Sequence, residues 1–225
     1  MNLANLHIDC CKTRMEWVAR IISDIANPLM FPPLLFLAAA WEFNAAAPQL
    51  IYVGAVGFTF FTFVPLALLV YLFKTGKIES LDITKQKSRN LPFFYTLMSY
   101  IAGALLLYNI DINGTTTLRI LLICYILNPI IGWLISQKWK ISVHTASVGT
   151  SVALFYMLYQ VSIGLQDMIL GKAALILLVM LIPVVMWSRY HLNIHTIGQV
   201  AGGAVIGVGV TYLEIMIMLN IDTLI

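Results

Sequence analysis

Seven long apolar runs alternate with short polar segments along this chain of 225 residues. A helix needs about 20 apolar residues to cross the hydrocarbon core of a bilayer, and most of these runs approach that length. Only 10% of the residues are charged, whereas a soluble domain carries about 25%. The chain therefore has too few charges to cover a water-exposed surface. We expect an all-α, polytopic membrane helical bundle with spans near residues 28–43, 50–73, 91–108, 117–136, 145–164, 168–187 and 196–219.

The beginning of the chain leaves the number of spans open. The first run is short and opens with Pro28, Pro32 and Pro33, which the first turn of a helix tolerates. Seven spans is the leading expectation, and six spans plus a surface helix is the alternative. Residues 1–27 form an amphipathic N-terminal segment that is too polar for a secretory signal. This segment either lies along the membrane surface or extends the first span, and residues 28–225 form the membrane domain.

The charged residues predict which side of the membrane each loop faces. Alternating crossings put the N-terminus and the segments 74–90, 137–144 and 188–195 on one side. That side holds all of the 13 Lys and Arg residues except Arg119 and Lys172, so it is expected to be cytoplasmic. We expect a protein of the plasma (inner) membrane, with its active site on the cytoplasmic face. Membrane lipids are the expected partners, nucleic acid is not, and the oligomeric state stays open.

Three polar segments on this side carry the candidate functional residues. The first is SLDITKQKSRNLP, residues 80–92. Arg89 offers a planar fork that matches phosphate oxygens, and Lys85 and Lys87 offer mobile point charges. An ordinary cytoplasmic loop would have a similar composition, so this segment alone does not predict a site.

The second segment, KISVHTAS, covers residues 140–147 and directly precedes the fifth apolar run. Ser142 is placed to cap a helix, and His144 falls in its first turn. Free backbone N–H groups and the helix dipole make such an end a natural phosphate site. A capping serine followed by an interfacial histidine is the simpler interpretation.

The third segment, SRYHLNIHTIGQ, covers residues 188–199. Gln199 follows His195 by four residues, so on a helix both side chains share one face and Gln199 can contact the imidazole. His191 and His195 have the same spacing, but no Cys or carboxylate accompanies them, and we expect no metal site. The following GQVAGGAVIGVG has the small-xxx-small pattern that is typical of closely packed membrane helices.

The third segment resembles a motif of the type 2 phosphatidic acid phosphatase family. Ser188 and Arg189, five residues, His195, three residues and then Gln199 are similar to the family's third motif, which reads Ser-Arg, five residues, His, three residues, Asp. The spacing is the same, and the departure is Gln199 in place of Asp. An amide can orient His195 but carries no charge to stabilise an imidazolium.

The other two segments resemble the remaining motifs of the same family. The stretch from Ile141 to His144 is similar to the second motif, Pro-Ser-Gly-His, and Arg89 lies where the first motif has its arginine. Asp82 stands where the first motif has a lysine, seven residues before Arg89. The resemblance covers residues 80–205.

The resemblance implies a metal-independent, cofactor-free hydrolase that acts on a lipid or prenyl phosphate. His195 would attack phosphorus and form a phosphohistidine, and His144 would protonate the leaving alkoxide. The phosphate oxygens would be held by Arg89, Arg189, Ser142, Ser188 and either Lys85 or Lys87. Two alternatives stay open. A lipid hydroxyl could replace water as the acceptor, or the protein could bind or move an anionic lipid without catalysis.

Overall fold

The computed structural model describes residues 13–83 and 86–222, and these ranges are all-α. Short connections join the helices, and a 3₁₀ turn (Gln86–Arg89) precedes α6. The helices are α2 (Arg14–Ile25), α3 (Phe31–Glu42), α4 (Ala47–Phe58), α5 (Val64–Lys74), α6 (Asn90–Leu107), α7 (Thr115–Ser136), α8 (Val143–Val161), α9 (Ile163–Asp167), α10 (Ile169–His191) and α11 (Ile197–Asp222).

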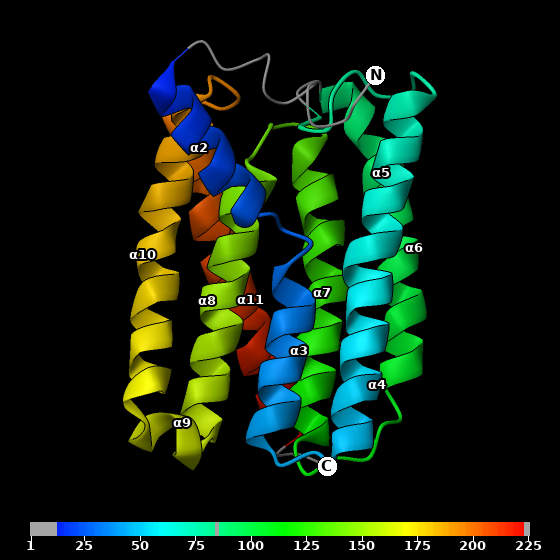
Figure 1. The fold of residues 1–225 in the computed structure, drawn as a ribbon, viewed down its shortest axis with the longest axis vertical. Coiled ribbons are helices and arrows are strands. Elements are labelled where there is room, and N and C mark those ends of the chain that lie inside the picture. The colour runs from blue at the N-terminus through cyan, green and yellow to red at the C-terminus, as the bar shows by residue number, and fades with distance from the viewer. Residues whose placement is uncertain (1–12, 84–85, 223–225) are drawn as a thin grey trace.

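The helices form a bundle with its connections at two ends (Figure 1). A π-helical turn, Thr59–Phe63, joins α4 and α5 into one continuous rod. Five segments are long and apolar enough to cross a membrane: Ala47–Lys74, Asn90–Leu107, Thr115–Ser136, Ile169–His191 and Ile197–Asn220. The protein is therefore an integral membrane protein, and the predicted all-α membrane bundle is confirmed.

A short apolar helix, α3, lies where the sequence predicts the first span. The 12 residues of α3 extend over about 18 Å, which is too short for a hydrocarbon core of about 30 Å. α2 occupies the other half of the bundle's height in Figure 1. Its end packs into the bundle, where Ala26 meets Val148 of α8 and Val185 of α10. The predicted run 28–43 therefore does not form a full span by itself.

The chain breaks between α2 and α3 at Asn27 and Pro28. Proline disfavours helical backbone in the residue before it, so the helix of α2 ends here. The side chain of Asn27 accepts a hydrogen bond from the backbone N–H of Leu29 at 3.0 Å, which replaces a helical partner. The break brings irregular backbone into the interior of the bundle, and Ser147 of α8 donates to the carbonyl oxygen of Pro28 at 3.4 Å.

α8 and α11 pack closely along their glycines. A Cβ on Gly207 would lie 2.1 Å from the carbonyl oxygen of Ala146, and a Cβ on Gly203 would lie 2.6 Å from that of Ser142. Gly149 of α8 meets the backbone of α11 in the same way. Backbones approach this closely only where side chains are absent, so the predicted small-residue packing is confirmed. The contact fixes the start of α8 beside the start of α11.

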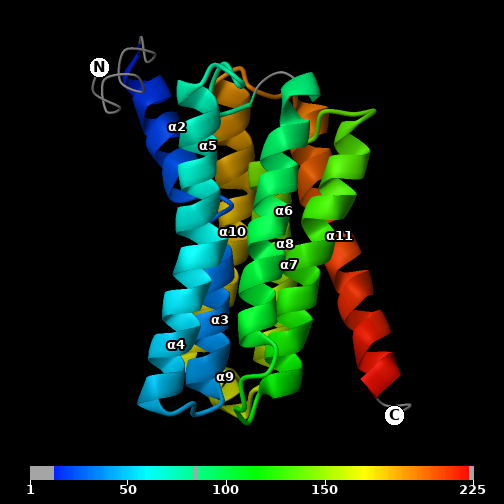
Figure 2. The same cartoon turned by 90° about the vertical axis from the view of Figure 1, so that its right-hand side faces the viewer.

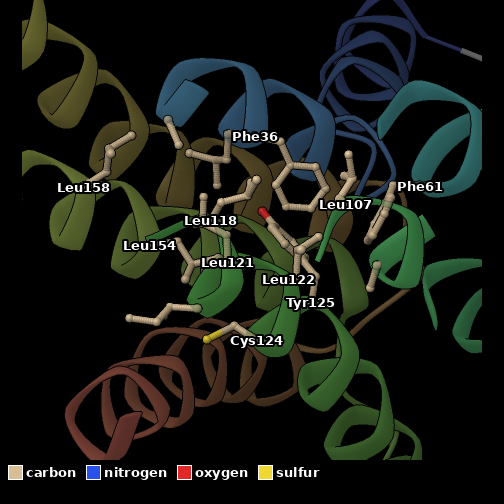
Figure 3. Close-up of a cluster of buried hydrophobic side chains, with 14 of the residues drawn as sticks. Phe36, Phe61, Leu107, Leu118, Leu121, Leu122, Cys124, Tyr125, Leu154 and Leu158 are labelled. Carbon is tan, nitrogen blue, oxygen red and sulfur yellow. The ribbon is translucent and has the colours of Figure 1, made fainter. Parts of the chain in front are cut away.

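The apolar core lies between α3, α7, α8 and the α4–α5 rod (Figure 3). Phe36 packs edge-on against Phe61 and Tyr125, with ring centroids 4.8 and 5.7 Å apart. Leu121 and Leu154 are fully buried in the same cluster. Removing a buried ring of this kind costs about 3–5 kcal/mol. α11 leaves the bundle toward its C-terminal end, as the turned view in Figure 2 shows.

Candidate functional site

The polar loops at one end of the bundle meet around a cavity of about 210 Å³. Its charged and histidine side chains come from all three segments singled out in the sequence: Asp82 and Arg89, His144, and Arg189 with His195. Its apolar walls include Leu69, Phe93, Tyr100, Ile131 and Ile206. Segments that are far apart in the sequence therefore converge on one site with a charged part and an apolar part.

His195 lies in the short connection between α10 and α11. Its backbone N–H donates to the carbonyl oxygen of Arg189 at 3.4 Å. Its Nδ1 lies 3.1 Å from Oε1 of Gln199, and the backbone N–H of Thr196 donates to the same oxygen at 3.2 Å. The contact between His195 and Gln199 that their spacing predicts is confirmed.

The bonds to Gln199 determine where the imidazole carries its proton. The N–H of Thr196 can only donate, so the amide atom facing it is the oxygen, and that oxygen can only accept from His195. The proton of the neutral ring is therefore assigned to Nδ1 from the hydrogen-bond network. Nε2 consequently carries a lone pair, which is the form that a nucleophile or a general base requires.

The surroundings of His195 keep its ring neutral. Burial lowers the pKa of His195, and the positive charges of Arg189, Lys140 and Arg89 lower it further. The hydrogen bond to Gln199 raises it, but the result is a pKa of about 3. At neutral pH the imidazole is therefore unprotonated, because each nearby cation opposes a further positive charge.

Arg89 is only 4% exposed and ends the 3₁₀ turn before α6. Its guanidinium donates to the carbonyl oxygens of Ile141 at 2.9 Å and Ile83 at 3.4 Å, and to Oγ of Ser136 at 3.4 Å. Burial and the neighbouring Arg189 lower the pKa of Arg89 to about 10, so it stays charged at neutral pH. Since these three partners are neutral, the positive charge favours an anion in the cavity.

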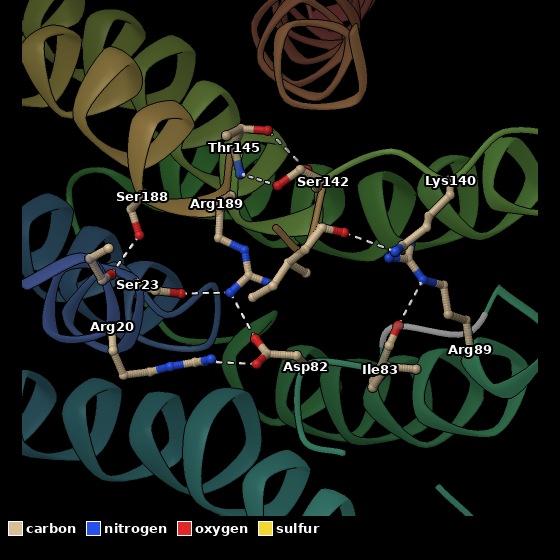
Figure 4. A network of polar contacts seen from close by, with 12 residues as sticks. Arg20, Ser23, Asp82, Ile83, Arg89, Lys140, Ser142, Thr145, Ser188 and Arg189 are labelled. Carbon is tan, nitrogen blue, oxygen red and sulfur yellow. Dashed lines mark hydrogen bonds and ion pairs between the residues drawn. The ribbon is translucent and has the colours of Figure 1, made fainter. Parts of the chain in front are cut away.

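A carboxylate bridges two arginines at the other side of the polar cluster (Figure 4). Nη1 of Arg189 donates to Oδ1 of Asp82 at 2.8 Å and to Oγ of Ser23 at 2.6 Å. Nη1 of Arg20 donates to Oδ2 of Asp82 at 2.7 Å. Arg189 is 1% exposed, and its buried Nε has no hydrogen-bond partner in the described part of the chain.

Asp82 is ionised over the whole physiological range. Burial raises the pKa of Asp82, but the charges and hydrogen bonds of Arg189 and Arg20 outweigh that effect and hold the pKa at about 2. The first motif of the phosphatase family that this segment resembles has a lysine at this position, whereas this chain has the ionised carboxylate of Asp82.

Two serines predicted to hold phosphate make helix contacts instead. Ser142 caps α8 by accepting from the backbone N–H of Thr145 at 3.4 Å, and Ser188 donates to the carbonyl oxygen of Ala19 in α2 at 2.6 Å. Neither residue is exposed, and neither lines the cavity. Both hydroxyl groups therefore take part in helix contacts outside the cavity: Ser142 accepts at the start of α8, and Ser188 donates to α2. The predicted phosphate ligand Lys85 and the side chain of Lys87 lie outside the described residues.

Sequence reasoning missed three residues of the polar cluster. Lys140 donates through Nζ to the carbonyl oxygen of Ile194 at 2.9 Å and so ties the start of α8 to the loop of His195. Arg20 and Ser23 reach the site from α2. Their spacing of three residues puts them on one helix face, and this was the only signal in the sequence.

His191 does not join His195. Its ring stacks on Trp187 of the same helix, with centroids 5.2 Å apart. Within residues 13–83 and 86–222, no group of three His, Cys, Asp or Glu side chains is arranged to hold a metal ion. The cationic side chains that line the cavity are Arg89 and Arg189.

No protein-family model matches this chain, and no curated protein or solved structure is significantly similar to it.

Proposed function

We propose that this protein is a membrane phosphatase that hydrolyses a lipid or prenyl phosphate through a phosphohistidine intermediate. The observation that carries the proposal is the state of His195 in the cavity. Its Nδ1 is bonded to Gln199, which leaves the lone pair on Nε2, and Arg89 and Arg189 line the same cavity. A neutral imidazole beside buried arginines is suited to attack phosphorus while the arginines hold the oxygens.

The chemistry proceeds in two displacements. Nε2 of His195 forms a bond to phosphorus, and the bond between phosphorus and the leaving oxygen breaks. His144, which lines the same cavity, donates a proton to that oxygen. Burial and the charge of Arg189 hold the pKa of His144 well below its usual range, so the negative charge of the bound substrate must raise this pKa for His144 to donate a proton. Water then attacks the phosphohistidine, with His144 accepting its proton, and His195 is regenerated. No metal ion is needed, because arginines stabilise the charge on the equatorial oxygens.

The apolar wall of the cavity supports an amphiphilic substrate. Leu69, Phe93 and Ile131 lie beyond the charged residues in the same cavity, so an acyl or prenyl tail would be buried beside the phosphate. The lining residues come from several membrane-spanning helices, including α5, α6, α7 and α11. A soluble phosphate ester would gain nothing from this wall.

The charge distribution supports a site that faces the cytoplasm. By sequence position, most Lys and Arg residues of the chain fall in or next to the segments that join the helices at this end, whereas Arg119 and Lys172 fall near the starts of α7 and α10, at the opposite end of the bundle. By the positive-inside rule the site belongs to the inner face of a plasma membrane.

Two other functions compete with hydrolysis. In the first, a lipid hydroxyl replaces water in the second displacement, and the protein is a phosphotransferase. In the second, the protein binds or moves an anionic lipid without chemistry. The neutral amide of Gln199 favours the binder, because a carboxylate in that position would support an imidazolium and an amide does not.

Phosphate release and trapping of the intermediate test these proposals together. Purified protein in detergent would receive lipid monophosphates and prenyl mono- and diphosphates, with and without an added lipid alcohol. A phosphatase releases inorganic phosphate and forms an acid-labile phosphoryl adduct at His195. His195→Ala should abolish both signals, whereas the control His191→Ala, which is stacked on Trp187, should keep them. Binding without release or adduct would contradict the enzyme and leave the lipid binder.

A further inference from the structure

Asp82 occupies the place where an external anion would bind the two arginines. Its two carboxylate oxygens accept from different guanidinium groups, Oδ1 from Arg189 at 2.8 Å and Oδ2 from Arg20 at 2.7 Å. Two oxygens of a phosphate bind a pair of arginines in the same manner. Asp82, Arg189 and His195 all line the cavity, so an anion bound to His195 and the carboxylate of Asp82 share one space.

The turn that carries Asp82 engages all three arginines of the site. The backbone N–H of Ile83 donates to the carbonyl oxygen of Ser80 at 3.1 Å and closes the turn. The carbonyl oxygen of Ile83 accepts from Arg89 at 3.4 Å. A carboxylate and a carbonyl of two adjacent residues thus occupy arginine donors that a phosphate would use.

This turn is held in a costly conformation. Ile83 has a φ of 46°, in the left-handed region, where a β-branched side chain is strained by about 1–3 kcal/mol. The bonds of Asp82 to the two arginines keep the turn in place. An anion that takes over these arginines would let the turn relax, so the strain favours an exchange of one anion for another.

An unpaired hydrogen-bond donor of Arg189 also supports the binding of a phosphate group in addition to the carboxylate of Asp82. Arg189 is almost completely buried, and its Nε has no hydrogen-bond partner in the described part of the chain. A buried unpaired donor of this kind costs free energy, and a phosphate oxygen would satisfy it. The bridge to Asp82 uses Nη1 of Arg189 and leaves Nε free to bond the incoming group.

We infer that Asp82 is a displaceable internal anion, and that a phosphate group replaces it between Arg189 and Arg20. Arg20 of α2 then becomes a phosphate-binding residue, although it lies 60 residues before the region that resembles a phosphatase. The inference rests on the proposed function. It adds that the resting site is occupied by its own carboxylate, and that the N-terminal half-helix is part of the binding site.

The experiment measures binding rather than turnover, by calorimetric titration of the purified full chain with inorganic phosphate and with octyl phosphate. Asp82→Asn keeps one oxygen for the arginines and removes the competing charge. It should tighten phosphate binding about tenfold, because a like charge no longer opposes the ligand. Arg20→Gln should weaken binding by a similar factor. Asp167→Asn in α9 and Arg119→Gln near the start of α7 make the same chemical changes at the other end of the bundle and should leave binding unchanged.

The possible outcomes separate this inference from the proposed function. If the parent protein binds phosphate and a folded Asp82→Asn variant binds it no more tightly, Asp82 is not displaced and the inference fails alone. Unchanged binding by Arg20→Gln overturns it as well, even if Asp82→Asn does not fold. If the parent protein binds neither compound and releases no phosphate, both proposals fail. A gain seen only with octyl phosphate supports a lipid headgroup as the displacing group, and a gain with both supports the phosphate group itself.

Discussion

Nδ1 of His195 and Oε1 of Gln199 lie 3.1 Å apart, and the backbone N–H of Thr196 holds the same oxygen in place. The amide is therefore anchored by the backbone and can orient the imidazole in one tautomer. A hydrogen-bond partner of a catalytic histidine can orient the ring, and a carboxylate partner also supplies a negative charge. Gln199 orients the ring but supplies no charge. Replacing Gln199 with a carboxylate therefore measures what the charge contributes.

We predict that Gln199→Asp raises the pKa of His195 and increases the rate of phosphate release. A carboxylate next to the ring favours the imidazolium that forms when Nε2 attacks, and it opposes the effect of the nearby arginines. A nuclear magnetic resonance titration of His195 and a pH–rate profile would be recorded for both proteins. Gln160→Asp, at the exposed far end of α8, should change neither. A lower rate without a shifted His195 titration would show that residue 199 does not act through the imidazole.

Close packing of α8 on α11 gives a prediction about stability. Gly207→Ala would place a Cβ 2.1 Å from the carbonyl oxygen of Ala146, so the two helices must separate. Overpacking of this kind costs about 1–3 kcal/mol and would also move Gln199 and His144 apart. The matched control is Gly209→Ala, whose Cβ would meet nothing within 4 Å and which gains helix propensity. Thermal unfolding in detergent should show a lower midpoint for the first variant only, and equal midpoints would contradict the packing.

The sequence was sufficient for most of the long helices and for local pairs. Apolar runs that approach the length of a bilayer crossing predict these helices directly, and the separation of four residues predicted the contact between Gln199 and His195, although His195 precedes α11. The glycine pattern of α11 also predicted a close helix contact, because the pattern is read from residues on one face of a single helix. These features are short-range, so they are readable without knowing which helices are neighbours.

The ion pairs of the site were not predictable, because they join distant parts of the chain. Asp82 meets Arg20 from 62 residues away and Arg189 from 107 residues away. Its role follows from the way α2 folds back on α10, and no periodicity encodes that. The sequence left open whether the N-terminal segment extends the first span or lies along the membrane surface, and hydropathy alone did not show that the run 28–43 forms a helix of only 12 residues. The same folding places Ser23 in the site.

The bridge at Asp82 predicts a loss of stability in acid. The pKa of Asp82 is lowered to about 2 in the folded protein from an ordinary 3.8, so the bridge stabilises the fold above about pH 4. This contribution is lost as pH falls from about 4 to 2. Asp82→Asn should be less stable at neutral pH, and the difference from the parent protein should shrink across this window. Thermal midpoints in detergent at several pH values measure this, with Asp167→Asn as the control. A constant difference down to pH 2 would show that the charge of Asp82 is not involved.

Chelation should leave phosphate release unchanged. The proposed displacement draws its positive charge from Arg89 and Arg189, and His191 is stacked on Trp187 rather than placed beside His195. Activity would be measured after dialysis against EDTA and again after adding Mg²⁺, Mn²⁺ or Zn²⁺. A loss that one of these ions restores would contradict the arginine mechanism and require a metal ligand set.

The arrangement of the polar loops predicts a common accessibility for positions 77, 138 and 190. Lys77, Lys138 and Tyr190 are exposed; Lys77 and Lys138 lie on two of the connections that meet around the cavity, and Tyr190 lies in the last turn of α10, next to the third. Each would be changed to cysteine in a cysteine-free background, and intact cells would be treated with a membrane-impermeant thiol reagent. All three should resist labelling until the cells are opened, because the rule for basic loops places this end in the cytoplasm. A cysteine at Asp111, which is exposed at the opposite end of the bundle, is the positive control and should be labelled from outside.

Labelling of all three and protection of the control would invert the orientation but keep the shared site. Labelling of only one or two of the three would mean that the loops lie on different sides of the membrane, and a site built from all of them would then be impossible.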